Sequence, residues 1–363
     1  MNFNAPLLRP LRILLFPLSF LFGVIICLRN WLFDKKIFDS TSFNLPVICV
    51  GNLTTGGTGK SPMVEHLVQS LKHQHKVAIL SRGYKRKTRG YALASQRTTA
   101  LDIGDEPMLF YNKFPDITIA VGEERIVAIP QLLHDKPDTD VIILDDAFQH
   151  RFVIAGLNIL LTDCNNLFTK DWFLPTGDLR DEKRSYKRAD ILVVTKCDPD
   201  LSLADKDDIK NEVNPLKHQE LFFSSIEYGI PYHLLTKETF NINSEVEVLM
   251  ISGIANPRPL KNYLLDNSGT YYEILYNDHH IFTIDDWKEI MNRFDSIQAE
   301  NKIILTTEKD AVRLMKFEQA IRNFPVYVIP IKVNFLFGGE HRFRELICKF
   351  ITEFRQTNKI IDG

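Results

Sequence analysis

The chain has 363 residues, 45% of them hydrophobic and 25% charged, which is enough for two folded domains with sizeable cores. Its formal net charge is −2, so no overall positive field favours binding to nucleic acid. The five cysteines are scattered and form no C-x-x-C pair, which argues against a disulfide framework or a zinc site and is typical of a reducing compartment.

The N-terminal stretch 13–28 carries no charge and is rich in Leu, Ile and Phe. It is shorter than the ~20 residues that span a bilayer comfortably, and no small-residue cleavage site of a signal peptide follows it. A buried core helix, a helix on the membrane surface and a true span all remain open. Basic residues on both flanks, together with Trp31 and Phe33, favour a helix that lies in the interface of an anionic leaflet, and we assign it to residues 1–36.

The next segment contains the most informative motif of the chain, T-T-G-G-T-G-K-S at 54–61. An apolar run at 45–50 predicts a buried strand before it, and apolar residues at helical spacing predict a helix over 61–72. Strand, Gly-rich turn and helix form the layout of a phosphate-binding P-loop. Its predicted nucleotide-binding residues are Thr54, Thr55, Gly56, Gly57, Thr58, Gly59, Lys60 and Ser61.

Each part of this loop has an expected task. The glycines allow backbone N–H groups to surround phosphate oxygens, Lys60 would reach the β- and γ-phosphates of ATP, and the Ser61 hydroxyl would bind Mg²⁺. Thr54 stands where the general P-loop pattern has its first glycine.

Apolar runs alternate with helical patterns along the first part of the chain. Strands are predicted at 45–50, 77–80, 117–121, 141–144, 157–162 and 191–195, with helices at 61–72 and 123–133. Several runs are continuous and rich in Val and Ile, as in parallel strands buried on both faces. This rhythm predicts a doubly wound, mostly parallel α/β domain over residues 37–220, of the P-loop NTPase type.

The rhythm breaks after residue 197. The runs 221–227 and 232–235 flank a Gly-Ile-Pro turn and predict a hairpin, which would serve as a linker over 221–236. Further apolar runs at 246–251, 271–275, 302–305 and 326–331 predict a smaller α/β/α domain over 237–363.

Candidate chemistry gathers at the predicted carboxyl ends of the strands. Asp145 and Asp146 end the run 141–144, a position at which P-loop proteins hold Mg²⁺, although an Asp there also caps helices. His150 follows within the same loop, and Tyr84 follows the second strand. Because ligands bind beyond these strand ends, all four are candidates for the site.

Other candidates lie in loops or at predicted helix starts. Asp105 precedes a helical pattern, so it is either an N-cap or the acceptor of a proton from an attacking hydroxyl. Arg180 is suited to stabilise a transferring phosphate and Asp181 to reach a metal. Arg125 opens a helix, where an ordinary salt bridge is an equally good explanation.

Two further motifs have weaker interpretations. His279 belongs to an Asp-His-His run, which is either structural or supplies a base-orienting imidazole. The segment 195–198, T-K-C-D, is similar to the short signature with which GTPases read guanine. A membrane-associated GTPase or ATPase switch and a non-catalytic scaffold therefore remain as alternatives to an enzyme.

Taken together, the ordered motifs resemble the tetraacyldisaccharide 4'-kinase family, the lipid A pathway kinases of Gram-negative bacteria. The motifs are G-N-L-T-T-G-G-T-G-K-S-P at 51–62, S-R-G-Y at 81–84, G-D-E-P at 104–107, L-D-D-A-F-Q-H at 144–150, L-R-D at 179–181, S-G-I-A-N-P at 252–257, D-H at 278–279 and T-E-K-D at 307–310. The resemblance covers nearly the whole chain, and Thr54 is normal for this family.

The resemblance implies an ATP- and Mg²⁺-dependent kinase that phosphorylates the 4'-hydroxyl of an acylated glucosamine disaccharide 1-phosphate. It implies two α/β/α domains joined by a two-stranded linker. The kinase would act at the cytoplasmic face of the bacterial inner membrane, and it would bind no nucleic acid and need no obligate protein partner.

The resemblance also implies roles for individual residues. Asp105 matches the general base and His279 its orienting partner, with Lys60 and Arg180 acting on the phosphate. The implied substrate-site residues are Asn52, Tyr84, Arg125 and His150, and the implied metal-site residues are Ser61, Asp145, Asp146 and Asp181. Two positions depart from the family pattern: Ala147 replaces an expected Gly, and Asp181 replaces an expected Glu, whose longer side chain reaches a metal more easily.

Overall fold

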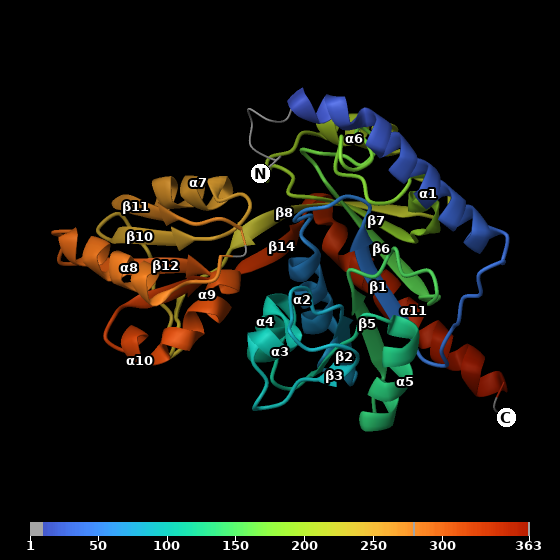
Figure 1. Cartoon of the computed structure of the whole chain (residues 1–363), viewed down its shortest axis with the longest axis horizontal. Coiled ribbons are helices and arrows are strands. Elements are labelled where there is room, and N and C mark those ends of the chain that lie inside the picture. Colours follow the sequence, from blue (N-terminus) through green and yellow to red (C-terminus); the bar gives the residue numbers. More distant parts are fainter. Residues whose placement is uncertain (1–9, 279, 362–363) are drawn as a thin grey trace.

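A large, mostly parallel sheet forms the first unit of the protein (Figure 1). The computed structural model describes residues 10–278 and 280–361. Within them the large sheet has nine strands in the order β14-β8-β7-β6-β1-β5-β2-β4-β3. The strands are β1 Val47–Asn52, β2 Val77–Ser81, β3 Ala92–Leu93, β4 Thr118–Val121, β5 Val141–Asp145, β6 Leu157–Asp163, β7 Ile191–Thr195, β8 Glu220–Tyr228 and β14 Ile331–Phe335. The doubly wound α/β prediction is confirmed, with each predicted strand present within a few residues.

Helices and ordered loops cover both faces of this sheet. One face packs against α2 Lys60–Leu71, α4 Asp105–Lys113 and α11 Gly339–Ile361, and the other against α5 Arg125–Asp135 and the loop after β6. The remaining helices of this unit are α1 Phe16–Asp34, α3 Ala100–Ile103 and α6 Leu203–Val213. Since β1 and β5 are central and parallel, their carboxyl ends meet at one edge, where Val50 pairs with Asp145.

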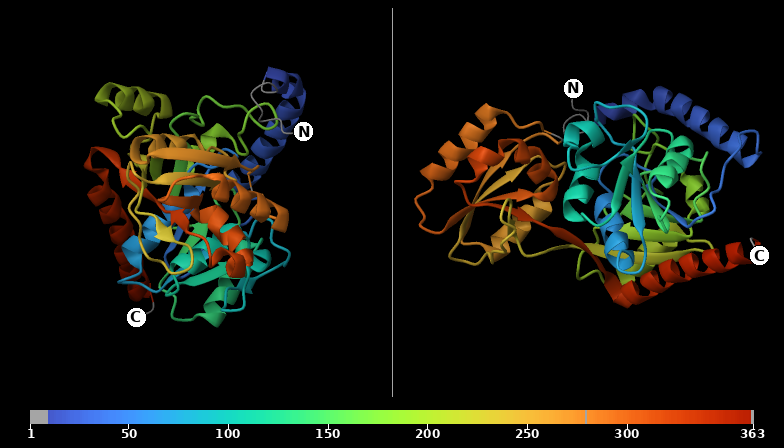
Figure 2. Two further views of the ribbon diagram at one scale, coloured as in Figure 1. Left: turned by 90° about the vertical axis from the view of Figure 1, so that its left-hand side faces the viewer. Right: turned by 90° about the horizontal axis from the view of Figure 1, so that it is seen from below.

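The second unit contains a smaller sheet in the order β11-β10-β12-β13-β9. Its strands are β9 Tyr232–His233, β10 Glu247–Ser252, β11 Thr270–Leu275, β12 Lys302–Thr307 and β13 Val326–Ile329. Its helices are α7 Arg258–Asn267, α8 Ile284–Ser296, α9 Glu308–Leu314 and α10 Glu318–Ile321. Figure 2 shows this unit beside the large one, with the connection between them running along one side.

The connection between the units differs from the expected hairpin. β8 pairs antiparallel with β14, where Tyr228 faces Ile331, whereas β9 pairs with β13 of the small sheet. The hairpin prediction at 221–236 is therefore wrong. It relied on closeness in sequence, but β8 finds its partner about a hundred residues later, which no local pattern reveals.

The C-terminal helix also departs from the expected second domain of 237–363. Phe343, Ile347 and Ile351 of α11 are buried in the core of the large sheet, together with residues of α2. Phe343 packs edge-on against Phe222 and lies beside Phe335. The chain therefore returns through β14 to the first unit and closes its core there.

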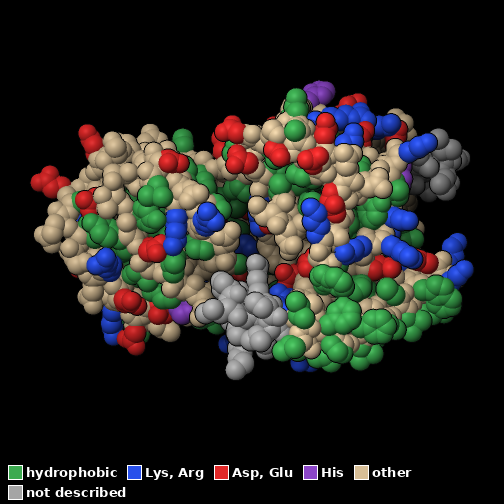
Figure 3. All heavy atoms as spheres, turned by 90° about the horizontal axis from the view of Figure 1, so that it is seen from above, with side chains coloured by type: hydrophobic (Ala, Val, Ile, Leu, Met, Phe, Trp, Pro, Cys, Tyr) green, Lys and Arg blue, Asp and Glu red, His purple; other side chains and the backbone are tan. Residues whose placement is uncertain are grey.

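Helix α1 lies on the outside of the large unit (Figure 1). The helical stretch Arg12–Asp34 has a mean hydropathy of 2.0 and is only 17% buried, so the interpretation as a core helix is wrong. Its buried positions are small or polar, namely Ser19, Gly23 and Asn30, apart from Phe33. Its large apolar side chains point outward, and Figure 3 shows hydrophobic side chains gathered over this face with Lys and Arg beside them.

The packing of α11 gives a stability prediction. Phe343→Ala removes a fully buried ring from the core of the large sheet and should lower the free energy of unfolding by about 3–5 kcal/mol, measured by urea denaturation. Lys349→Ala on the exposed side of the same helix should change it by less than about 0.5 kcal/mol. Equal effects of the two substitutions would contradict this assignment of α11.

Candidate active site

The P-loop lies where β1 ends and α2 begins. Gly56 and Gly59 have positive φ angles of 104° and 83°, and Gly59 directly precedes α2. Both conformations suit glycine and turn backbone N–H groups toward the start of the helix. An ideal Cβ on Gly56 or Gly57 would meet nothing within 4 Å, so the space beside these two glycines is open. The predicted strand, loop and helix are all present.

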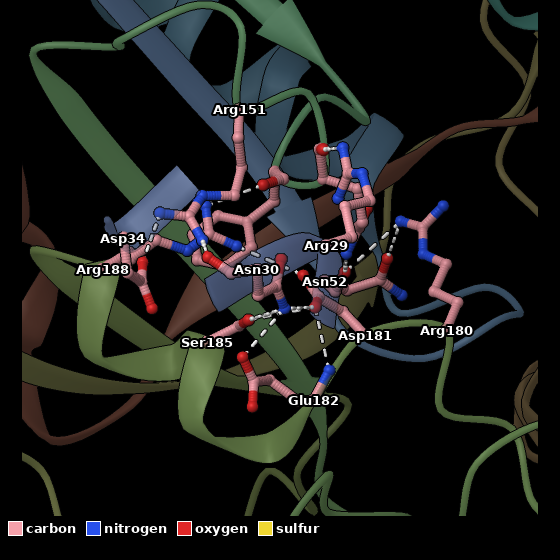
Figure 4. Close-up of polar contacts among 12 residues, drawn as sticks. Arg29, Asn30, Asp34, Asn52, Arg151, Arg180, Asp181, Glu182, Ser185 and Arg188 are labelled. Carbon is pink, nitrogen blue, oxygen red and sulfur yellow. Dashed lines mark hydrogen bonds and ion pairs between the residues drawn. The ribbon is translucent and has the colours of Figure 1, made fainter. Parts of the chain in front are cut away.

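Lys60 lies in a compact network of opposite charges. Its Nζ is 3.2 Å from Asn52 Oδ1 and 3.7 Å from Asp146 Oδ1. The guanidinium of Arg180 binds both carboxylate oxygens of Asp146 and also Asn52, as Figure 4 shows for Asn52. Although burial opposes it, Lys60 and Arg180 lower the pKa of Asp146 to about 2. Asp146 is therefore ionised and paired with two cations.

Asp145 has a different environment from its neighbour. It is buried at the end of β5 and accepts a hydrogen bond of 3.1 Å from the Ser81 hydroxyl. Burial, followed by the nearby charges of Glu106 and Asp146, raises its pKa to about 7. The two adjacent carboxylates thus face different partners, as expected from their position at a strand end.

Glu106 is a residue of this site to which sequence reasoning assigned no role. Its Oε1 accepts a 3.2 Å hydrogen bond from the Ser61 hydroxyl and a 2.5 Å bond from Lys309 Nζ. Although burial opposes it, Lys309 and Lys60 hold the pKa of Glu106 below its usual value. Its position beside Asp105 in the first turn of α4 was the available signal, but only the fold shows that α4 points at the P-loop.

Asp105 lies at the interface with the second unit. Its Oδ2 accepts a 2.8 Å bond from Arg313 Nε, and Arg313 also pairs with the buried Asp310 at 3.0 Å. Arg313 and Lys309 lie one turn apart on α9, so one helix of the second unit contacts both adjacent carboxylates of α4. Within the T-E-K-D motif, Lys309 therefore binds Glu106 directly, and Asp310 holds the Arg313 side chain that binds Asp105. His279, its expected partner, lies outside the described residues.

The predicted substrate residues occupy distinct environments. Asn52 is fully buried and holds Lys60 and Arg180, while Tyr84 is exposed on the loop after β2. Arg125 is also fully buried, and its guanidinium binds the carbonyl oxygens of Gly122 and Asp145. These contacts link the ends of β4 and β5, and a role of Arg125 in substrate binding stays a prediction.

His150 keeps a neutral ring near the same strand end. Burial, followed by Arg125 and other nearby guanidinium groups, lowers its pKa to about 4. A neutral imidazole can both donate and accept a hydrogen bond at physiological pH.

Asp181 departs most from its expected place. Its Oδ1 accepts bonds from Asn30 (2.7 Å), Ser185 (3.0 Å) and the backbone N–H of Glu182 (2.8 Å). Its Oδ2 pairs with Arg188 at 3.2 Å. The carboxylate is buried against α1, and these donors occupy it (Figure 4). The Asp181 side chain, shorter than the expected Glu, is therefore held by donors of the protein itself.

Oxygen atoms of the kind that bind Mg²⁺ lie near the P-loop. Ser61, Asp145 and Glu106 are linked to one another by contacts or charge coupling. Among the described residues, no group of three or more His, Cys, Asp or Glu is arranged to hold a metal ion. This arrangement fits Mg²⁺, which uses one or two carboxylates together with substrate phosphate.

Several buried polar atoms of the site also lack a protein partner in the described part of the chain. They are Asn52 Nδ2, Thr58 Oγ1 and Arg180 Nε. Buried donors without a partner are costly, so a ligand that accepts hydrogen bonds here would be stabilising.

Comparison with known proteins agrees with this geometry. The family model described as Tetraacyldisaccharide-1-P 4'-kinase matches residues 11–352. A protein named tetraacyldisaccharide 4'-kinase from Parabacteroides distasonis is 43% identical over 347 residues, which cover 93% of this chain and 94% of that protein. A protein of the same name from Flavobacterium johnsoniae is 41% identical over 345 residues, with 94% and 98% covered.

A solved structure shares the architecture as well. LpxK from Aquifex aeolicus, in a crystal structure described as a complex with ATP, aligns with a TM-score of 0.73 and 30% sequence identity. The alignment covers 94% of this chain and 99% of that one. With the family model, these relatives and the site geometry in agreement, the chain belongs to the tetraacyldisaccharide-1-phosphate 4'-kinase family.

Proposed function

We propose that this protein transfers the γ-phosphate of ATP to the 4'-hydroxyl of an acylated glucosamine disaccharide 1-phosphate, a step of lipid A biosynthesis. The observation that carries the proposal is one network of contacts at the P-loop. In it, Lys60 and Arg180 both pair with Asp146 at the end of β5, and Ser61 binds Glu106 of α4. Phosphoryl transfer depends on positioning and on neutralising charge, and this set of groups supplies both.

In this proposal, the side chains of Lys60 and Arg180 bind the phosphates of ATP. Lys60 is held at the start of α2 by Asn52 and Asp146, which orient its ammonium group toward the loop opening. Arg180 is fixed by the same two residues and is aimed at charge that develops on the transferred group. When the nucleotide binds, the partnerless donors of Asn52, Thr58 and Arg180 gain acceptors.

Asp105 is the proposed general base, and His279 its orienting partner. Arg313 fixes the orientation of the Asp105 carboxylate from the second unit, so a hydroxyl group reaching this interface would meet a positioned proton acceptor. Mg²⁺ would be held by Ser61 and Asp145, with Glu106 close by, and would neutralise phosphate charge. We leave Asp181 out of this set because protein donors already occupy its carboxylate.

The outward-facing apolar surface of α1 is suited to contact with a lipid layer. Phe16, Phe20, Leu21, Ile25 and Trp31 are each about half exposed or more. We propose that this face lies in the cytoplasmic leaflet of the inner membrane, so that acyl chains stay in the bilayer while the sugar enters the site.

A GTPase switch is not favoured, because Lys196 of the T-K-C-D segment pairs with Asp163 and Thr195 bonds to the P-loop carbonyl of Thr58.

Removing the proposed base tests the chemistry. Asp105→Ala should lower disaccharide-dependent ATP turnover by about 10²–10⁴-fold, the usual range for general acid–base groups, while ATP still binds with similar affinity in calorimetry. Asp116→Ala, at an exposed carboxylate in the turn after α4, should retain normal turnover. Full activity of Asp105→Ala would remove this residue from the mechanism, and a wild-type protein without turnover would sink the proposed function.

Polar substitutions on α1 test membrane binding. Phe20→Ser combined with Leu21→Ser should weaken co-sedimentation with anionic vesicles by about tenfold or more, because each buried side chain contributes about 1.5–3 kcal/mol. Leu265→Ser replaces an equally exposed residue of the second unit and should leave vesicle binding unchanged. If both proteins sediment like the wild type, α1 is not the membrane contact.

A further inference from the structure

The segment that carries Arg180 is enclosed between the P-loop and the N-terminal helix. Here the Arg180 segment means residues 171–185. On one side its backbone pairs with the start of the P-loop: Thr55 N donates to Asp178 O at 2.7 Å and Arg180 N to Leu53 O at 2.9 Å. Thr54 and Leu179 form an antiparallel bridge between these contacts. The position of the Arg180 backbone is thus tied to the P-loop itself.

On the other side, the N-terminal helix holds the Arg180 segment at several points along its length. Arg12 donates to the carbonyl of Pro175 at 2.8 Å and pairs with Asp178 at 2.9 Å. In the middle, the hydroxyl of Ser19 bonds to Thr176. One turn further, an ideal Cβ on Gly23 would meet the Phe173 ring at 2.7 Å, so only glycine allows this close approach.

Asn30 contacts the residue that directly follows Arg180. Its side-chain amide donates to Asp181 Oδ1 at 2.7 Å and to Glu182 Oε1 at 2.9 Å (Figure 4). Both Asn30 and Asp181 are 1% exposed. A buried amide that donates to a buried carboxylate is a directional contact, and its loss removes one of the donors that hold the Asp181 carboxylate in place. Because Asp181 directly follows Arg180, this contact fixes the chain at the residue next to the phosphate-site guanidinium.

A second series of hydrogen bonds links the same turn of the N-terminal helix to the phosphate-site network. Arg29 donates to the carbonyl of Gln149 at 2.7 Å, and the Gln149 amide donates to Asn52 O at 2.8 Å. Asn52 in turn accepts from Lys60 and Arg180. The N-terminal helix therefore reaches the phosphate-site network both through Asp181 and through Gln149.

We propose that Asn30 is a positioning residue of the phosphate site: by holding Asp181 it fixes Arg180 against Asp146 and Asn52, so that the membrane helix is a structural part of the active site as well as an anchor. This inference rests on the proposed kinase activity. It explains why the inner face of α1 carries Ser19, Gly23 and Asn30, which fit the Arg180 segment, while large apolar residues lie outside.

A double-mutant cycle in detergent micelles tests the proposal, because micelles remove any effect of membrane anchoring. Asn30→Ala should lower kcat by about 10- to 100-fold through misplacement of Arg180. In an Arg180→Ala background, adding Asn30→Ala should lower kcat by less than about twofold, since the group it positions is gone. An unchanged kcat for Asn30→Ala, or factors that multiply in the double variant, would overturn the proposal.

A matched control on the same helix is Asp34→Asn. Asp34 pairs with Arg151 at the exposed end of α1, and within the described residues it makes no contact with the Arg180 segment, so kcat should stay within about twofold of the wild type. All variants should bind anionic vesicles like the wild type, since the outer face is unaltered. A kcat loss for Asp34→Asn equal to that of Asn30→Ala would point to general loosening of α1 and overturn the specific role of Asn30.

A readout independent of catalysis separates this inference from the proposed function. Amide hydrogen exchange of residues 171–185 in full-length Asn30→Ala should be faster than in the wild type, while exchange in β10 and β12 stays the same. If the wild type shows no kinase activity but this difference appears, the activity is wrong and the positioning role stands. Unchanged exchange in a folded Asn30→Ala protein would overturn the positioning role whatever the activity.

Discussion

The structure depends on a concentration of negative charge at the end of β5, which cations from separate parts of the chain neutralise. Asp145, Asp146 and Glu106 lie close enough to couple, and the pKa of Asp145 rises to about 7 mainly through burial and then through Glu106. Lys60 comes from the P-loop and Arg180 from the segment under α1. Lys309 comes from the second unit. Three distant segments thus converge at one place, because carboxylates that are fully or partly buried are costly without partners.

This charge arrangement explains how the two units meet. The paired strands β8 and β14 carry the chain out and back, while α9 contributes Lys309 and Arg313 to the carboxylates of α4. A second contact lies deeper, where Lys113 of α4 bridges Glu65 of α2 and Glu308 of α9 at 2.6 Å each. Helices α2 and α4, which border the P-loop site, are therefore linked directly to α9 of the second unit. Through this link, the position of the second unit can affect the geometry of the helices beside the P-loop.

The N-terminal helix reverses the usual polarity of a surface helix. Its small and polar residues face the protein, and its large apolar residues face outward. This arrangement is unfavourable in water and favourable in a lipid interface. The same inner face allows the Phe173 ring of the Arg180 segment to pack closely against Gly23 and allows Asn30 to bind Asp181.

The sequence alone determined the parallel sheet, the P-loop and the acidic strand end, because continuous Val- and Ile-rich runs and the Gly-Lys-Ser turn are local signals. Only the tertiary structure decided the partner of β8, the return of α11 to the first core and the contacts of Glu106, Lys309 and Asn30. It also turned Asp181 toward α1 and buried Arg125 among carbonyl oxygens. These features arise from contacts between residues up to about two hundred positions apart, and their formation depends on packing and charge pairing that no short stretch of sequence encodes.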